Sequence, residues 1–167
     1  AFSPDDLKIL VTADQGDVKI FNKNGQLFNS FKTPRFISTA AFSPNGKTIL
    51  IAGDMTRLCD LNGNVLKTFE RHKYITRSVA FSQNGSMIVT AGDDGIAKIW
   101  SSDGNEVAVL RGHKEGSTFA VFSPNGQYVL TGSYDMSAKL WDFSIRPSTL
   151  ISIPGHYITS AVFSPDD

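Results

Sequence analysis

One six-residue phrase returns along the chain at a near-constant interval. It reads AFSPDD at Ala1–Asp6, then AFSPNG, AFSQNG and VFSPNG, and finally VFSPDD at Val162–Asp167. A fixed period of this length is typical of proteins that stack copies of one small structural unit. The repeat therefore constrains the fold more than any other feature. The phenylalanines of the five copies are spaced by 40, 39, 41 and 41 residues: Phe2, Phe42, Phe81, Phe122 and Phe163.

Each period has the pattern of short strands. In the third period, β-rich segments at Ile75–Ser82, Ser86–Gly92, Ile96–Trp100 and Val107–Leu110 are separated by turn signals such as Asn84-Gly85. No segment shows helical periodicity over about 10 residues. Four short strands in about 40 residues are the unit of a β-propeller, the blade.

We therefore predict an all-β protein, a β-propeller of four-stranded antiparallel blades that forms a single array over residues 1–167. One such blade cannot bury both of its faces, so its stability must come from stacking on its neighbours. The predicted repeats are 1–35, 36–73, 74–114 and 115–156, followed at 157–167 by the first strand of a next blade.

Four blades leave the ring incomplete. In a seven-bladed ring each blade turns the chain by about 51°. Ala1–Ser3 supplies only the tail of a first strand, whereas Ile158–Ser164 would be a first strand without a blade. Two possibilities stay open: the chain is part of a longer propeller, or a homodimer completes an eight-bladed ring.

The last two complete repeats share a set of polar residues at one spacing. In each set the histidine precedes the aspartate by 22 residues, and the aspartate precedes the tryptophan by 6. With the recurring FSPNG phrase, these residues closely resemble the WD-repeat family over essentially the whole chain. The resemblance implies that they form a structural tetrad, one in each blade: His72, Thr90, Asp94 and Trp100, and His113, Thr131, Asp135 and Trp141.

The tetrad makes chemical sense as a buried bracing network. A buried aspartate needs partners. We expect the imidazole to donate one N–H to it and the other to a neighbour, with the threonine hydroxyl joining the network to the indole N–H. A set that recurs once per blade is not a single active site. Blade 1 departs from the pattern at Gln15, and blade 2 has Cys59 in place of the tryptophan and a shorter hairpin. We expect both to rely on apolar packing and to deform more easily.

The resemblance also implies a docking surface. In WD-repeat proteins the edge that carries the loops between blades is the usual face for partners. Aromatic residues and arginine, the types enriched at energetic hot spots, occur at the corresponding positions. The alternative is that these aromatics only pack between blades. The residues placed at this edge are Arg35, Phe36, Ser38, Ile75, Arg77, Asp93, Thr118, Tyr134, Tyr157 and Thr159.

Composition excludes several other classes. The formal net charge is zero, which gives no bulk attraction for nucleic acid. No apolar stretch approaches the roughly 20 residues that span a bilayer, so we expect no membrane insertion. We expect no metal site and no cofactor, because the histidines fall one per repeat. The lone Cys59, a small buried hydrophobe in this interpretation, and the lack of a signal peptide favour an intracellular, cytoplasmic location.

The leading hypothesis is a non-catalytic scaffold that presents one face and the central funnel to protein or peptide partners. The competing hypothesis is a propeller enzyme, or one that binds a small ligand or glycan, with its site in the central channel. That site would need several ionisable side chains converging from different blades. The inner positions are largely small and hydroxylic instead, as at Ser38–Ala40 and Thr159–Ala161, and these do not supply an acid and a base. A third possibility is a sensor module attached to another domain.

Overall fold

A computed structural model describes residues 1–142, 148–152 and 156–164. The described residues form antiparallel strands and no helix. In chain order the strands are β1 (Lys8–Thr12), β2 (Asp17–Asn22), β3 (Leu27–Lys32), β4 (Ile37–Phe42), β5 (Thr48–Gly53), β6 (Arg57–Asp60), β7 (Val65–Thr68), β8 (Thr76–Phe81), β9 (Met87–Gly92), β10 (Ile96–Ser101), β11 (Glu106–Arg111), β12 (Ser117–Phe122), β13 (Tyr128–Ser133), β14 (Ser137–Asp142) and β15 (Ser148–Ser152).

The strands form four separate sheets, each a meander of consecutive strands. Blade 1 comprises β1–β3, blade 2 β4–β7, blade 3 β8–β11 and blade 4 β12–β15. We letter the strands of a complete blade a to d. Phe2 makes an isolated bridge to Ile9, so the chain start takes the place of strand a in blade 1. Glycines at positive φ, such as Gly46 and Gly85, close the a–b turns. The predicted all-β propeller blades are confirmed.

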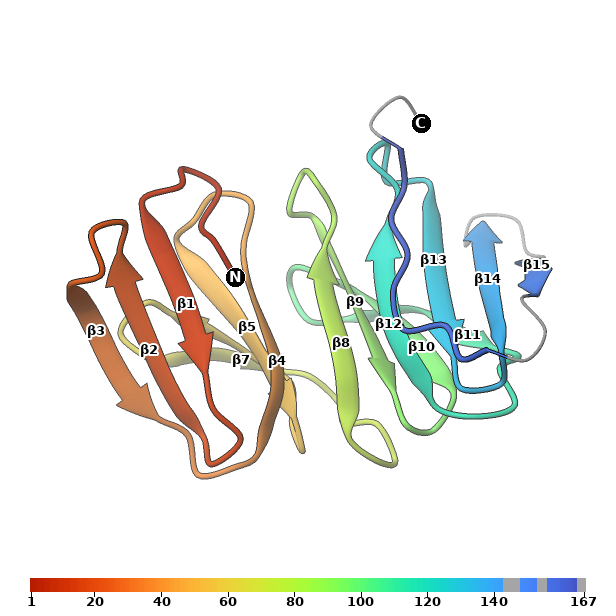
Figure 1. Cartoon of the computed structure of the whole chain (residues 1–167), viewed down its shortest axis with the longest axis horizontal. Helices are drawn as coiled ribbons and strands as arrows, with labels where there is room; N and C mark the ends of the chain where they lie inside the picture. Colours follow the sequence, from red (N-terminus) through yellow and green to blue (C-terminus); the bar gives the residue numbers. More distant parts are fainter. Residues whose placement is uncertain (143–147, 153–155, 165–167) are drawn as a thin grey trace.

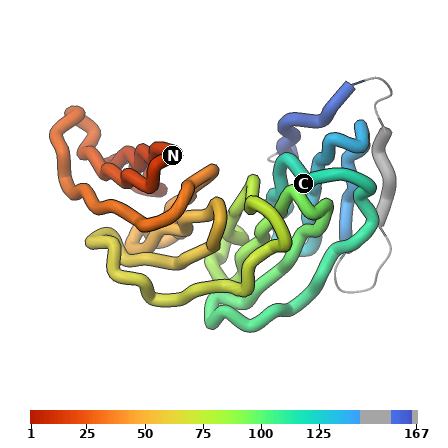
Figure 2. Tube along the Cα trace, turned by 90° about the horizontal axis from the view of Figure 1, so that it is seen from below, coloured from red at the N-terminus to blue at the C-terminus, as the bar shows by residue number. Residues whose placement is uncertain are grey.

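The four blades stand side by side in chain order (Figure 1). Viewed along the perpendicular direction they follow an arc that does not close, with the first and last blades at its two ends (Figure 2). The array is therefore an open part of a ring.

The hydrophobic core consists of layers between consecutive blades. Adjacent residues of a strand point to opposite faces of its sheet, so the neighbours Ile88 and Val89 enter different layers. Ile88 packs with Leu50 of blade 2, and Val89 packs with Phe122 of blade 4. A blade thus gains most of its buried surface from its neighbours.

A β-bulge recurs in strand a of every complete blade. The pairing of strands a and b shifts register between Ile37 and Thr39 in blade 2, and at equivalent positions in blades 3 and 4. Bulges redirect a side chain away from the regular alternation. The residues inside them are Ser38, Arg77 and Thr118.

The predicted strand at Ile158–Ser164 is wrong. These residues lie against the outer face of blade 4, where Ile158 is buried with Phe119 and Leu130, but they form no ladder. A first strand is held by its pairing with the second strand of its own blade, and no described residue supplies that second strand. The side chains pack as predicted for an inter-blade layer, but the backbone has no partner strand.

Candidate functional site

The four predicted tetrad residues of blade 3 form one continuous hydrogen-bonded chain. The Trp100 indole N–H donates to the Thr90 hydroxyl oxygen at 3.1 Å, and Thr90 lies 2.8 Å from Nε2 of His72. Nδ1 of His72 lies 3.0 Å from Asp94. The network links the d–a loop before the blade, through His72, to strands b and c. It therefore braces the blade against the loop that leads into it.

Blade 4 repeats the arrangement with the same geometry. Trp141 donates to Thr131 at 2.8 Å, Thr131 lies 2.8 Å from Nε2 of His113, and Nδ1 of His113 lies 3.0 Å from Asp135. Ser137 adds a hydroxyl that donates to Asp135. Two copies of one buried network, one per blade, have the form of a structural brace.

The protonation states determine the direction of these hydrogen bonds. Burial lowers the pKa of His72 and of His113, against the opposing effect of the aspartates, so both rings are neutral at pH 7. Burial alone would raise the pKa of Asp94, but His72 and the backbone N–H groups of Lys73 and Ile96 outweigh it and lower the pKa.

A neutral imidazole has one N–H. That N–H donates to the aspartate, so Nε2 accepts from the threonine hydroxyl. The expectation that the ring donates through both nitrogens is therefore wrong.

Blade 2 replaces the network with apolar contacts. Thr33 stands where the histidine would be, and its hydroxyl bonds to backbone carbonyls instead. Ile51 stands in place of the threonine. Cys59 replaces the tryptophan and is buried in the layer shared with blade 1, where burial raises the pKa of its thiol. The predicted small buried hydrophobe fits this environment.

The d–a loops and the hairpins joining strands b and c meet along one edge of the array, which we call the d–a rim. Backbone N–H groups of the hairpins donate to the loops: Asp93 to the Ile75 carbonyl at 2.9 Å, and Tyr134 to the Gly116 carbonyl at 3.1 Å. The rim lies at the lower edge of the blades in Figure 1. The residues predicted to bind partners occur along it.

The bulge residues at the rim have different roles. The Ser38 hydroxyl donates to the Thr76 carbonyl of blade 3, and the Thr118 hydroxyl donates to the Ile158 carbonyl at 2.5 Å. The Ser38 hydroxyl thus links blade 2 to blade 3, and the Thr118 hydroxyl links blade 4 to the segment at Ile158. Both residues are half-buried, and their hydroxyls make hydrogen bonds within the array.

Arg77, at the same bulge position in blade 3, turns outward instead. Its guanidinium makes a two-pronged ion pair with Asp93, with Nη2 2.7 Å and Nε 2.8 Å from the two carboxylate oxygens. Both residues were predicted for the rim, and the structure brings them together. Sequence pattern alone could not show the pairing, because a bulge leaves no residue signature.

Two predicted rim tyrosines also meet. The rings of Tyr134 and Tyr157 lie edge to face with centroids 5.6 Å apart, and they are 39% and 63% exposed. Arg35 and Thr159 are exposed, whereas Phe36 and Ile75 are half-buried. Sequence reasoning missed a further set at the rim, namely Asp54, Arg71, Lys73 and Tyr74. The signal that could have found it is the run of cationic and aromatic residues flanking His72.

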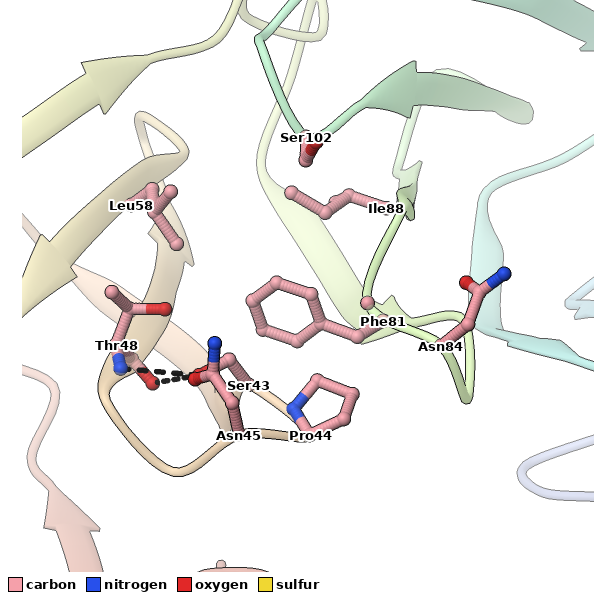
Figure 3. Close-up of a pocket in the computed structure, with 10 residues that line it drawn as sticks. Ser43, Pro44, Asn45, Thr48, Leu58, Phe81, Asn84, Ile88 and Ser102 are labelled. Carbon is pink, nitrogen blue, oxygen red and sulfur yellow. Dashed lines mark hydrogen bonds between the residues drawn. The ribbon is translucent and has the colours of Figure 1, made fainter.

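The opposite edge of the array, formed by the a–b turns, carries a groove between blades 2 and 3 (Figure 3). It holds about 400 Å³. Leu58 and Phe81 face one another across it, and Ser43 and Asn45 lie at its border. No ionisable side chain lines this groove, whose residues are all neutral. It has no group able to serve as a general acid or base.

Two features are absent from the described residues. No group of three or more His, Cys, Asp or Glu side chains that could hold a metal ion occurs among them. Within the same part of the chain, no helix has the length and apolarity needed to cross a membrane.

An open arc of antiparallel blades, two of which carry a His–Thr–Asp–Trp network, defines a β-propeller array. The family model described as WD domain, G-beta repeat, matches residues 63–101 and 104–142. The chain thus carries two WD repeats and is similar to WD-repeat proteins. Each match runs from strand d of one blade to strand c of the next, so one sequence repeat links two blades.

Two relatives illustrate the similarity. A WD repeat-containing protein of Synechocystis is 30% identical over 104 residues, which are 61% of this chain and 31% of that protein. Polyadenylation factor subunit 2 of Cryptococcus neoformans is 28% identical over 106 residues, 60% of this chain and 15% of that protein. The matched region thus spans less than a third of the length of either relative.

Proposed function

We propose that the chain is a non-catalytic scaffold whose d–a rim binds protein partners. The observation that carries the proposal is the exposed Tyr134–Tyr157 pair on the same rim as the Arg77–Asp93 ion pair. Tyrosine and arginine are the types that dominate binding energy at interfaces. The rim is held rigid by backbone hydrogen bonds between loops and hairpins, which lowers the entropy cost of association.

The relatives also support a role in binding proteins. One of them is a factor subunit by name, and WD repeats generally mediate protein interactions. The buried thiol of Cys59 fits a reducing environment, so the proposal includes an intracellular location.

The test is capture of partners from a lysate by the array and by rim variants. Arg77→Glu and Tyr134→Ala alter the rim, whereas Lys47→Glu and Leu66→Ala make matched changes at exposed positions elsewhere. Loss of the same protein from both rim variants, with retention by both controls, supports the proposal. Retention by all four variants contradicts it. Circular dichroism verifies that each variant is folded.

A further inference from the structure

A small hollow opens on the d–a rim between blades 2 and 3. It encloses about 170 Å³. This is less than the roughly 300–1,000 Å³ of pockets for whole small molecules, and it suits one functional group of a larger partner. The lining residues are Arg35, Asp54, Arg71, His72, Lys73, Tyr74 and Ile75.

The hollow lies beside a shortened hairpin. In blade 3, Thr90 pairs with Lys98, eight positions later, whereas in blade 2 the equivalent Ile51 pairs with Arg57, six positions later. The blade 2 hairpin is therefore two residues shorter, and its Asp54 lines the hollow. The shortened hairpin thus borders the hollow.

The hollow is electropositive. Arg35, Arg71 and Lys73 supply three cations against the single carboxylate of Asp54, and buried His72 is neutral. Within the described part of the chain, none of the three cations makes an ion pair with another residue. This contrasts with Arg77 on the same rim, which Asp93 neutralises.

An aromatic surface adjoins the cations. The Lys73 ammonium lies 5.2 Å from the centroid of the Tyr74 ring, which is 56% exposed. Tyr74 precedes Arg77 by three residues in the chain, and the hollow and Arg77 both lie on the d–a rim. A peptide lying on the rim can contact both the hollow and the surface around Arg77.

We propose that this hollow binds an anionic side chain, a carboxylate or a phosphate, of a partner peptide. Guanidinium groups bind such oxygens through paired N–H donors. The chain has no net charge, so a local positive site suits one anionic group rather than a polyanion. This inference rests on the proposed function and specifies that the partner bound at the rim carries an anionic group.

The test is an NMR titration of the ¹⁵N-labelled chain with three capped pentapeptides, Gly-Ser-X-Ser-Gly. Position X is phosphoserine, aspartate or serine, so the arms separate phosphate from carboxylate and both from an uncharged peptide. The site variant is Arg35→Gln/Arg71→Gln. The control is Lys23→Gln/Lys47→Gln, which removes the same charge from exposed positions outside the hollow.

We expect saturable shifts of the amide signals of residues 71–75 with at least one anionic peptide and none with the serine peptide. The site variant should bind at least about tenfold more weakly, since losing one charged hydrogen bond is sufficient for that change. The control should bind like the unaltered chain. Absence of saturable shifts, or equal weakening in both variants, overturns the inference. If rim variants still lose their protein partner in that case, the proposed function stands without it.

Discussion

The ring of Phe69 in blade 2 lies edge-on against the ring of Trp100 in blade 3, with centroids 5.6 Å apart. Both side chains are buried in the layer between these blades. Because Trp100 also donates to Thr90, the network of blade 3 holds the aromatic surface on which blade 2 packs. Blade 2 has no His–Thr–Asp–Trp network of its own. It packs against Trp100, which the network of blade 3 holds in place.

Thr90→Val tests the network directly. The substitution leaves the Trp100 indole N–H and Nε2 of His72 without partners in a buried site. Each unsatisfied buried group costs about 1–3 kcal/mol, so for two groups we expect the free energy of unfolding to fall by about 2–6 kcal/mol. Urea denaturation measures it. Thr68→Val, at an exposed strand position, should change it by less than about 0.5 kcal/mol, and equal effects of the two substitutions would contradict the bracing role.

Stability should fall on acidification. Below about pH 6.5 the unfolded chain protonates His72 and His113, whose pKa values burial lowers in the folded chain. The unfolded state then binds more protons, and stability decreases as the pH drops. Below about pH 4 the lowered pKa values of Asp94 and Asp135 add a further loss.

Denaturation at pH 7, 6 and 5 measures the first part of this loss. A His72→Gln/His113→Gln variant should show a flatter dependence over this range, whatever its absolute stability. A chain that becomes more stable towards pH 5 would rule out neutral buried rings.

Ser38→Ala should weaken the junction of blades 2 and 3. The Ser38 hydroxyl donates to the Thr76 carbonyl across the blade boundary, and one such hydrogen bond contributes about 0.5–1.5 kcal/mol. We expect a loss of that size in thermal or urea unfolding. Ser30→Ala, at an exposed position, serves as the control. A variant as stable as the control would show that the hydroxyl does not secure the junction.

Hydrogen exchange should distinguish the blades. Strand β2 of blade 1 and β10 of blade 3 both have a partner strand on each side, so their pairing is comparable. Blade 1 has Gln15 and Val11 where a network would have aspartate and threonine. We expect faster exchange in β2 than in β10, and in blades 1 and 2 than in blades 3 and 4. Equal protection would mean that apolar packing alone suffices.

The two ends of the arc should associate. Phe2 is 70% exposed and Val162 is 87% exposed, at opposite ends of the arc. Exposed apolar sheet faces promote association. In sedimentation equilibrium we expect the average mass to rise with concentration, and Phe2→Ser/Val162→Ser to reduce this. A chain that stays monomeric at every concentration would count against association through these faces.

Much of the architecture could be predicted from the sequence. The period, the turn residues and the alternation of apolar positions specify strands locally, so β9 and β10 agree to within one residue at each end with the predicted Ser86–Gly92 and Ile96–Trp100. The tetrads were equally accessible, because two sets of residues at one spacing resemble the WD-repeat family, and the resemblance implies that the four side chains of each set meet. These features depend on local chemistry and on repetition, both of which one sequence displays.

The tertiary structure decided what depends on neighbouring blades. Ser38, Arg77 and Thr118 hold equivalent positions, yet two of them bond to the next segment and Arg77 turns to Asp93. Likewise Ile158–Ser164 has the pattern of a strand but no ladder, because a ladder requires a partner strand. The cationic hollow lies where loops from two blade junctions meet a shortened hairpin. The sequence determined the blades, and the packing of one blade on the next determined which side chains remain free to bind.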